Sequence, residues 1–372
     1  PRMSKAAELA ALIGSQSAQG NRNLIINGAF QVAQRATSVT GVTGDGYQAV
    51  DRWQNQSGSL GTFTMSQSTT TPDGFAFSHK YDCTTADASP SAGDFLIFQH
   101  RIEAQNLQHL QYGTSGAKSI TLSFHVRSNK TGTYIAELSH GDATSKNQQS
   151  YTINSANTWE KKTLTYVGQT SDAINNDTGI GMFIQFWLGA GSTYSSGTLT
   201  QNTWANTTAA NRAAGQVNLA DSTDNEWYVT GVQLELGEQA TPFEHRSFAD
   251  ELARCQRYYE NFAGWTTGES VIYLAGRILT SNRVDLTYKY KVTKRAAPSL
   301  TISTDNGSEG TAPSIIIYPS NATRETLSGE STAISGANIT SANIRTSGGA
   351  TFTANHAATA QMNTDFAFDA EL

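Results

Sequence analysis

Apolar and polar residues alternate along several short stretches of this chain. In SITLSFHVRSN one face carries Ile120, Leu122, Phe124 and Val126, and the other face carries polar side chains. IGMFIQFWLGAG repeats the pattern, with Phe183, Gln185 and Trp187 opposite the apolar register. A period of two predicts half-buried strands. Similar runs lie near residues 62–66, 74–81, 94–98, 133–138, 159–167 and 227–236.

These strands define the expected fold class. They are short, polar turns separate them, and no strand–helix–strand spacing occurs, so we expect a mainly β protein with an antiparallel jelly-roll β-sandwich over residues 23–246. Strand patterns resume over residues 264–372 in VIYLAGRIL, RVDLTYKYKV and SIIIYP. We therefore predict a smaller C-terminal β-domain. A Gly/Ser/Thr/Ala-rich run follows there, with regularly spaced Ile334, Ile339, Ile344 and Phe352.

Residues 4–13, SKAAELAALI, show the pattern of a short N-terminal helix. Ser4 can cap this helix and Gly14 can end it. About ten residues do not hold a helix alone in water, so this one should dock on a partner. Because the polar stretch GSQSAQGN follows as a linker, we interpret residues 1–22 as an anchor to another chain through Leu9, Leu12 and Ile13. A frayed tail is the alternative.

A second helix is predicted over residues 247–263, connecting the two β-domains. Ser247 and Asp250 form a capping box at its start. Apolar residues then follow at spacings of four and three, as in a heptad seam. The members of this seam are Phe248, Leu252, Cys255, Tyr259 and Phe262. Either one helix packs on a sheet, or three copies meet on an axis and make a homotrimer.

Composition fits this β-rich picture and excludes some partners. The chain has 372 residues, 38% hydrophobic and 15% charged, with 9% aromatic residues to supply large buried side chains. Its net charge is −6 and its Lys and Arg residues form no stripe, so we expect no nucleic-acid partner. No apolar stretch approaches the ~20 residues of a membrane span, so we expect no membrane insertion. Cys83 and Cys255 fit no metal or redox spacing and should be buried.

The usual catalytic motifs are absent from the sequence. There is no G-x-S-x-G, no H-E-x-x-H and no Walker loop, and the seven histidines are dispersed. We therefore predict no enzymatic activity, no catalytic residue, no cofactor and no metal site. A glycosidase needs only two carboxylates ~5–10 Å apart, so a depolymerase stays as an alternative. Its candidate acids are Asp82, Asp87, Asp94, Glu103, Asp221, Asp224 and Glu226.

Several motifs in a fixed order resemble a family of bacteriophage structural proteins, the tail fibre and minor virion proteins. They are NLIINGAFQVAQR, DRW, TLSFHVRSN and WYVTGVQLELGEQATPFEHRSFADELARCQRYYE, and the likeness spans nearly the whole chain. The block VQLE-G-x-x-A-T-P-F-E-x-R running into C-Q-R-Y-Y is the most specific part. The resemblance implies a virion protein, bound to other virion proteins through its N-terminus.

Residues 23–243 also resemble carbohydrate-binding jelly rolls, whose first strand commonly reads N-L-x-x-N-G-x-F-E, so the resemblance implies a first strand at NLIINGAF. Those modules often hold a structural calcium near that strand, but Gln31 replaces the acidic residue here and removes a charged ligand. For sugar stacking, the candidates are Trp187, outside the apolar register, and Tyr194 and Trp204, in a polar loop. Packing in the core or between subunits is the alternative for each.

The expected function is a subunit of a phage tail fibre or similar external appendage, helping the particle attach to bacterial surface glycans. The first alternative is a capsid decoration or head fibre with a purely structural role. The second is a polysaccharide depolymerase.

Overall fold

The computed structural model describes residues 21–206, 208–262, 272–302, 314–320, 325–328, 331–347, 352–362 and 366–372. The chain forms two compact units, Pro1–Glu251 with Leu372, and Leu252–Glu371. This boundary falls inside the segment predicted to be the connecting helix. The proposed anchor with Leu9, Leu12 and Ile13 lies outside the described residues. No helix in the described ranges is long and apolar enough to cross a membrane.

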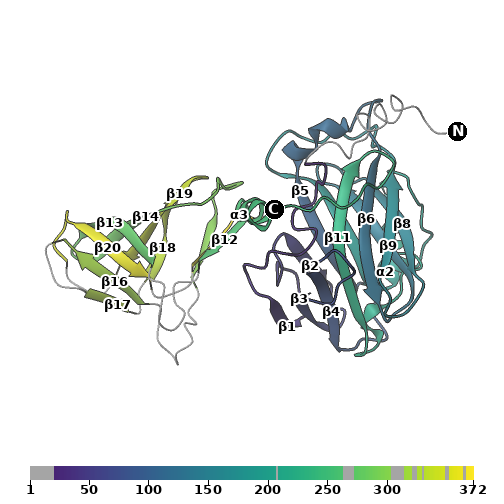
Figure 1. The fold of residues 1–372 in the computed structure, drawn as a ribbon, viewed down its shortest axis with the longest axis horizontal. Helices are drawn as coiled ribbons and strands as arrows, with labels where there is room; N and C mark the ends of the chain where they lie inside the picture. The colour runs from purple at the N-terminus through teal and green to yellow at the C-terminus, as the bar shows by residue number, and fades with distance from the viewer. Residues whose placement is uncertain are drawn as a thin grey trace. The chain divides into compact units, whose positions relative to one another are not determined.

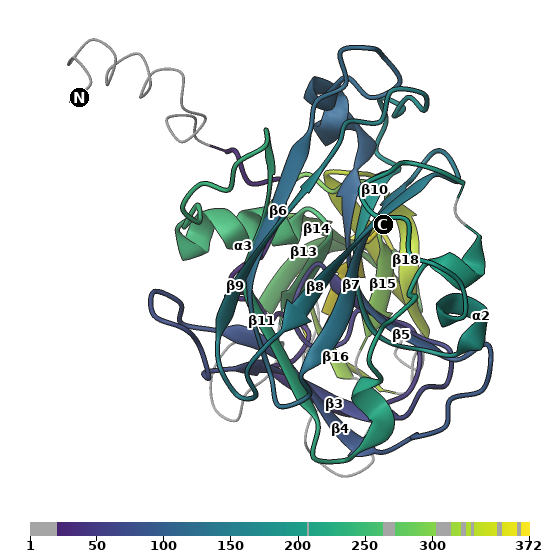
Figure 2. The ribbon, with the colours of Figure 1, turned by 90° about the vertical axis from the view of Figure 1, so that its right-hand side faces the viewer.

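The first unit is an antiparallel jelly-roll β-sandwich, as predicted. Its six-stranded sheet has the order β1-β3-β4-β11-β6-β9, and its five-stranded sheet the order β2-β5-β10-β7-β8. Figure 2 shows these as two layers, with β6, β9 and β11 in one layer and β5, β7 and β10 in the other. The strands are β1 (Ser38–Val42), β2 (Trp53–Ser57), β3 (Thr62–Ser68), β4 (Ser78–Thr85), β5 (Phe95–Glu103), β6 (Ile120–Ser128), β7 (Gly132–His140), β8 (Lys146–Ile153), β9 (Glu160–Tyr166), β10 (Ile180–Ala190) and β11 (Glu226–Leu236).

Short helical segments connect some of these strands. The longest is the 3₁₀-helix η2 (Ala104–Leu110), which follows β5. Between β10 and β11 lie α2 (Ser192–Ser195), η3 (Ala209–Asn211) and η4 (Leu219–Asp221). In Figure 2, α2 lies on the outer side of the five-stranded layer. Residues of this connection therefore cover aromatic side chains on the outer face of that sheet.

The sandwich core confirms the inward register predicted for β6. Ile120, Leu122, Phe124 and Val126 are fully buried between the sheets. Phe30 and Trp53 are buried as well, with their ring centroids 5.2 Å apart, as expected for core residues beside the first segment. Burying these side chains removes apolar surface from water, which is the main favourable term in folding.

The opening segment NLIINGAF is buried but does not form the strand that was expected. It makes two backbone hydrogen bonds with β11, from Leu24 N to the carbonyl of Leu234 and from Val232 N to the carbonyl of Gly28, both 2.9 Å. Side chains bond several of its other backbone groups. Asn23 N donates to Glu244 Oε2 (2.7 Å), Asn27 N donates to Glu251 Oε1 (2.6 Å), and Arg246 Nη1 donates to the carbonyl of Ile25 (2.9 Å). The block E-H-R-S-F-A-D-E thus holds the first segment in place.

The predicted connecting helix is shorter than its heptad pattern indicated. α3 spans Phe248–Gln256, and Ser247 caps it by accepting from Asp250 N (3.2 Å). Tyr259 and Phe262 lie instead on β12 (Tyr259–Phe262), which pairs with β21 (Phe366–Asp369). The seam is therefore wrong beyond Cys255, because long-range strand pairing replaces the last helical turns. Cys255 is buried and Phe248 is 56% exposed, while Leu252 is intermediate.

The second unit is also β-structure, which agrees with the prediction for the C-terminal region. One sheet has the order β12-β21-β15, and a larger one the order β17-β16-β20-β13-β14-β19-β18 (Figure 1). The remaining strands are β13 (Ile272–Thr280), β14 (Arg283–Lys289), β15 (Ser299–Ile302), β16 (Ser314–Pro319), β17 (Glu325–Ser328), β18 (Ser331–Ala337), β19 (Ser341–Ser347) and β20 (Ala357–Met362). Of the regularly spaced residues, Ile344 and Phe352 are buried and Ile339 is 46% exposed.

Candidate functional site

Trp187 and Tyr194, two of the three predicted glycan-stacking residues, lie together on the outer face of the five-stranded sheet. Their ring centroids are 5.5 Å apart, and the ring of Phe95 stands edge-on to Tyr194 at 5.5 Å. Trp187, however, is fully buried, so the expectation of an exposed indole platform is wrong. Stacking of Trp187 on a sugar stays a prediction, and it would require the residues that bury the indole to move away.

The cover over Trp187 comes from residues 191–199 and 208–217, here called the covering segment. It folds back onto the sheet, where Val217 N donates to the carbonyl of Thr133 (2.9 Å). Ala213 from this segment packs in one apolar cluster with Trp187, Ile97 and Ile135. An apolar patch on the outside of a sheet is costly to hydrate, so covering it with loop residues stabilises the fold.

Trp204, the third predicted residue, lies elsewhere. Its ring stands edge-on to Tyr112, with centroids 5.7 Å apart, and its indole N–H donates to the carbonyl of Val167 (2.7 Å). It is half-buried and packs against the main core. The structure therefore does not join the three aromatic residues into one surface.

A row of polar side chains crosses all five strands of the same outer face. Strand pairing places each member directly opposite the next. The row, here called the amide row, is Gln54, Gln99, Gln185, Glu137 and Gln148. Alternation within each strand predicts only that these residues point outward. Their alignment depends on register between distant strands, which the sequence pattern did not give.

Members of the amide row bond to one another. The amide of Gln99 lies 2.6 Å from that of Gln54 and 2.9 Å from that of Gln185, measured between nitrogen and oxygen. Gln148 Nε2 donates to Glu137 Oε2 at 2.8 Å. Most of the row is buried, but Gln54 is half-buried at its β2 end.

Arg212 joins the amide row to the covered aromatic residues. Its Nη2 donates to Glu137 Oε1 at 2.6 Å, and Glu137 has no exposed side-chain surface. Its guanidinium carbon lies 4.9 Å from the centroid of the Trp187 ring, within the range of a cation–π contact. Arg212 thus fixes the covering segment by charge as well as by packing.

Parts of this face on β2 and on the central strand β10 are more accessible. Gln54, Gln56 and Phe183 are half-buried, and we call them the open strip. The guanidinium of Arg101 lies over the Phe183 ring, 5.5 Å from its centroid. Amide groups, an aromatic ring and a planar cation therefore lie on this face. Arg101 also donates to an oxygen of the C-terminal residue Leu372.

Six of the seven acidic residues considered for a depolymerase make side-chain contacts within the protein. On the outer face of the other sheet, Lys80 Nζ lies 2.6 Å from Glu226 and 3.5 Å from Asp82. Burial opposes ionisation of Glu226, but hydrogen bonds from Lys80 and Tyr228 prevail and lower its pKa. Four further acids accept hydrogen bonds: Asp87 from Ser89 N, Asp94 from Ser91 N, Glu103 from Gln105 and Asp221 from Asn225.

The calcium implied by the resemblance does not fit the residues near the first segment. Across the described ranges, no three His, Cys, Asp or Glu side chains form a group that could hold a metal ion. Beside NLIING, the positively charged group is the guanidinium of Arg246, which donates to the carbonyls of Asn23 and Ile25. Its Nη1 also lies 3.5 Å from Glu251 Oε2. A guanidinium thus binds carbonyl and carboxylate oxygens that would otherwise suit a hard cation.

Both cysteines are buried thiols, as predicted from their isolation in the sequence. Burial raises the pKa of the Cys83 thiol to about 11, so it stays protonated at neutral pH. Neither cysteine contributes reactive chemistry to the face described above.

No family model matches the chain, and no curated protein matches its sequence. Among solved structures, it is similar to the enzymatically active domain of tailspike protein 4 from bacteriophage CBA120, at 12% identity and a TM-score of 0.30. That alignment covers 58% of this chain and 21% of the tailspike chain, so this chain spans about a fifth of its length.

Carbohydrate-binding modules are similar at the same low level. The C-terminal family 22 module of Clostridium thermocellum Xyn10B aligns at 13% identity and a TM-score of 0.30, over 60% of this chain and 99% of the module. TmCBM61, solved in complex with β-1,4-galactotriose, aligns at 10% identity and a TM-score of 0.28, over 58% and 99%. These similarities assign no role to any residue.

Proposed function

We propose that residues 23–246 form a non-catalytic glycan-binding sandwich in an external appendage of a bacteriophage particle. The observation that carries this proposal is the amide row, with the half-buried Gln54, Gln56 and Phe183 of the open strip on the same face. The face differs from an ordinary solvated sheet surface, because its polar groups form one continuous array bordered by aromatic rings.

The chemistry of this face suits neutral sugars. An amide side chain both donates and accepts hydrogen bonds, as sugar hydroxyls do, so a glutamine array can match a chain of hydroxyls. An aromatic ring provides an apolar surface for the C–H face of a pyranose. Specific sites generally combine apolar surface with a few oriented polar groups. Phe183 and Gln54 are the residues we expect to touch the ligand.

A binding role without catalysis is supported by the engagement of the candidate acids. Glu137, the carboxylate within the amide row, is fully buried and bonds to Arg212, Gln148 and Ser139. A general acid or base must instead reach the reacting atoms of its substrate. Host polysaccharide incubated with the protein should therefore yield no new reducing ends.

The virion location and the homotrimer belong to this proposal through the resemblance to phage appendage proteins. Phe248 at the start of α3 is 56% exposed, so its ring is available for a contact between copies. Light scattering on the full chain should give a trimer mass at micromolar concentration. A monomer would contradict the trimer without affecting glycan binding.

The test of the proposed function is binding of the full chain to purified surface polysaccharide from the host and to a glycan array. Phe183→Ala and Gln54→Ala should each weaken binding, and the double variant should weaken it further. The matched control is Trp159→Ala, which removes a half-buried ring from the segment leading into β9 of the other sheet.

Each outcome of this test separates the proposal from its alternatives. Binding that falls in the Phe183 and Gln54 variants and persists in the control supports the open strip. Absence of binding to any glycan would favour a capsid decoration or head fibre. Release of reducing ends would establish a depolymerase.

A further inference from the structure

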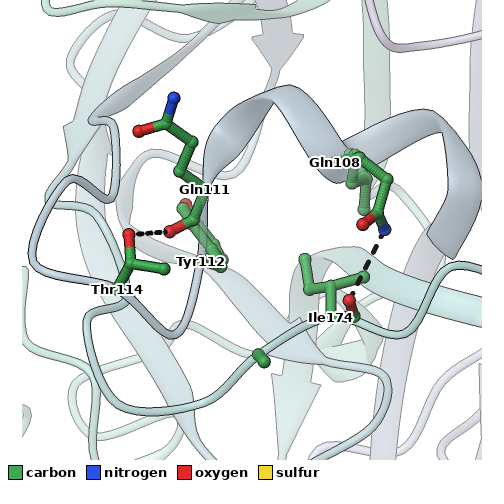
Figure 3. Close-up of a pocket in the computed structure, with 7 residues that line it drawn as sticks. Gln108, Gln111, Tyr112, Thr114 and Ile174 are labelled. Atoms are coloured by element: carbon green, nitrogen blue, oxygen red, sulfur yellow. Dashed lines mark hydrogen bonds between the residues drawn. The ribbon is translucent and has the colours of Figure 1, made fainter.

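A hollow of about 380 Å³ lies at one end of the sandwich, away from the amide row. It is formed by η2, the turn that follows it, and the loop near residue 174 (Figure 3). Its lining residues are Leu107, Gln108, Gln111, Tyr112, Thr114, Ala173 and Ile174. This volume is near the lower end of the range for small-molecule sites, which suits a ligand of modest size.

Backbone geometry and hydrogen bonds hold the walls of the hollow. Gln111 has φ 55° and Gly113 has φ 80°, and a Cβ on Gly113 would lie 2.6 Å from the Cα of Ala173. Glycine is therefore needed where the turn meets the loop. Gln108 Nε2 donates to the carbonyls of Ala104 (3.0 Å) and Asn175 (2.8 Å), which links η2 to the opposite wall.

The lining is neutral and divides into an apolar part and a polar part. Leu107 is buried and Ile174 is half-buried, so they offer aliphatic surface. Gln108, Gln111 and Thr114 are exposed and carry amide or hydroxyl groups. Apart from the tyrosine, no lining side chain can ionise, so a charged ligand would find no partner of opposite sign.

Tyr112 supplies an unused hydrogen-bonding group. The residue is 6% exposed, and its hydroxyl has no hydrogen-bond partner among the described residues. A buried polar group without a partner is destabilising. A ligand hydroxyl that reached this buried atom, through a small shift of the exposed rim side chains, would therefore gain binding free energy. Burial raises the pKa of Tyr112, so the hydroxyl stays a neutral donor at physiological pH.

Trp204 fixes the ring that carries this hydroxyl. It stands edge-on to Tyr112, and its own N–H is bound to the carbonyl of Val167. The tryptophan predicted to stack on a glycan is thus placed behind the hollow as a positioning residue for Tyr112.

We propose that this hollow is a second binding site, which takes a single uncharged pyranose ring. Aliphatic surface from Leu107 and Ile174 meets the C–H face, the Gln108, Gln111 and Thr114 side chains meet hydroxyls at the rim, and the Tyr112 hydroxyl bonds to one hydroxyl group. The inference shares its class of ligand with the proposed function, on which it rests, but it uses a different surface.

The test is saturation-transfer NMR on the full chain with D-glucose, D-galactose and D-mannose as probes, and D-glucuronate as the charged counterpart. At least one neutral sugar should bind, and glucuronate should not. Tyr112→Phe should weaken that binding about five- to tenfold, the effect of one hydrogen bond. The matched control is Tyr290→Phe in the second unit, another buried tyrosine whose hydroxyl has no partner among the described residues.

A second variant keeps the proposal open to refutation if Tyr112→Phe has a small effect. Ala173→Tyr adds a ring to an exposed position that lines the hollow, and it should abolish the signal without unfolding the protein. If sugar binding survives both variants, or falls equally in Tyr290→Phe, the hollow is not the site.

Comparison with the open strip separates the two proposals. Phe183→Ala should leave monosaccharide binding in the hollow unchanged. Polysaccharide binding that depends on Phe183, with no monosaccharide signal sensitive to Tyr112, would overturn the hollow and leave the proposed function standing. No binding of any saccharide would overturn both.

Discussion

The guanidinium of Arg212 lies over the indole of Trp187, 4.9 Å from its ring centroid, and also binds the buried carboxylate of Glu137. One side chain from the covering segment thus satisfies a buried charge and closes an aromatic surface. Trp187 is hidden because of this contact, although its position in β10 gives an outward direction.

Removal of Arg212 should destabilise the sandwich strongly. Arg212→Ala leaves Glu137 buried with only neutral partners, and breaking a buried ion pair from one side costs about 3–5 kcal/mol. Urea unfolding of the first unit measures this loss. The control is Lys130→Ala, whose ion pair with Asp221 is more exposed, with about 30% of each side chain accessible. That change should cost under about 1 kcal/mol, and an equal loss in both variants would contradict the account.

Substitution of Gly28 should be poorly tolerated. A Cβ at this position would lie 2.1 Å from the carbonyl oxygen of Val232, which accepts from Asn23 Nδ2 in the same region. Gly28→Ala must therefore displace backbone on β11, at a cost of about 3 kcal/mol. Thermal unfolding measures the change. Gly44→Ala is the matched control, because its Cβ would meet nothing within 4 Å, and it should change the melting temperature little.

His79 should make the sandwich sensitive to acid. Burial lowers its pKa from 6.5 to about 3, and its ring stacks on Phe98 with centroids 4.4 Å apart. Between these two pH values the unfolded chain binds a proton that the folded chain does not. Stability is therefore complete above pH 6.5 and falls by about 1.4 kcal/mol per pH unit as the pH drops toward 3.

His79→Phe keeps an aromatic ring and removes this titration. Melting temperatures between pH 7 and pH 4 should decline less steeply in the variant than in the native protein. His100 also has its pKa lowered by burial, so some acid sensitivity should remain. The exposed His245→Gln is the control, and its pH profile should match the native one. An unchanged slope in His79→Phe would disprove this role.

In the second unit, Lys294 should stabilise the sheet that contains β12. Its Nζ lies 2.8 Å from Glu260 Oε2, and neither side chain has exposed surface. Lys294→Met leaves Glu260 with neutral donors, among them the Tyr288 hydroxyl at 2.6 Å, and should cost about 3–5 kcal/mol. Calorimetry should show a lower transition for this unit. Arg345→Met, at a more exposed pair with Asp285, should change it little, and equal shifts would contradict the prediction.

The sequence predicted strands more reliably than it predicted the length of the connecting helix. Alternation in β6 gave the buried face correctly, because a pleated strand points successive side chains to opposite sides whatever its partner is. Spacings of four and three over residues 248–262 were misleading beyond Cys255. Two periods of a heptad are a weak signal, and pairing of β12 with β21 prevailed.

The candidate site was predictable only in part. Trp187 was correctly placed outside the apolar register, yet its exposure depended on the covering segment, which folds over it. The sequence did not identify Gln54, Gln99 and Gln185 as one row. Each is a single outward polar residue in its own strand, and only the pairing of the strands brings the three together. Tyr112 gave no pattern at all, and only the turn at Gly113 and the loop at Ala173 make it part of a hollow.

The sequence by itself determined that this protein is β-structure, which residues of the clearest strands face inward, and that its two cysteines are isolated. These are local properties, set by side-chain period and spacing. Tertiary structure alone decided which outward residues share a face, which of them stay accessible, and where a hollow forms. Those outcomes depend on contacts between segments far apart in the chain, whose free energies no local pattern encodes.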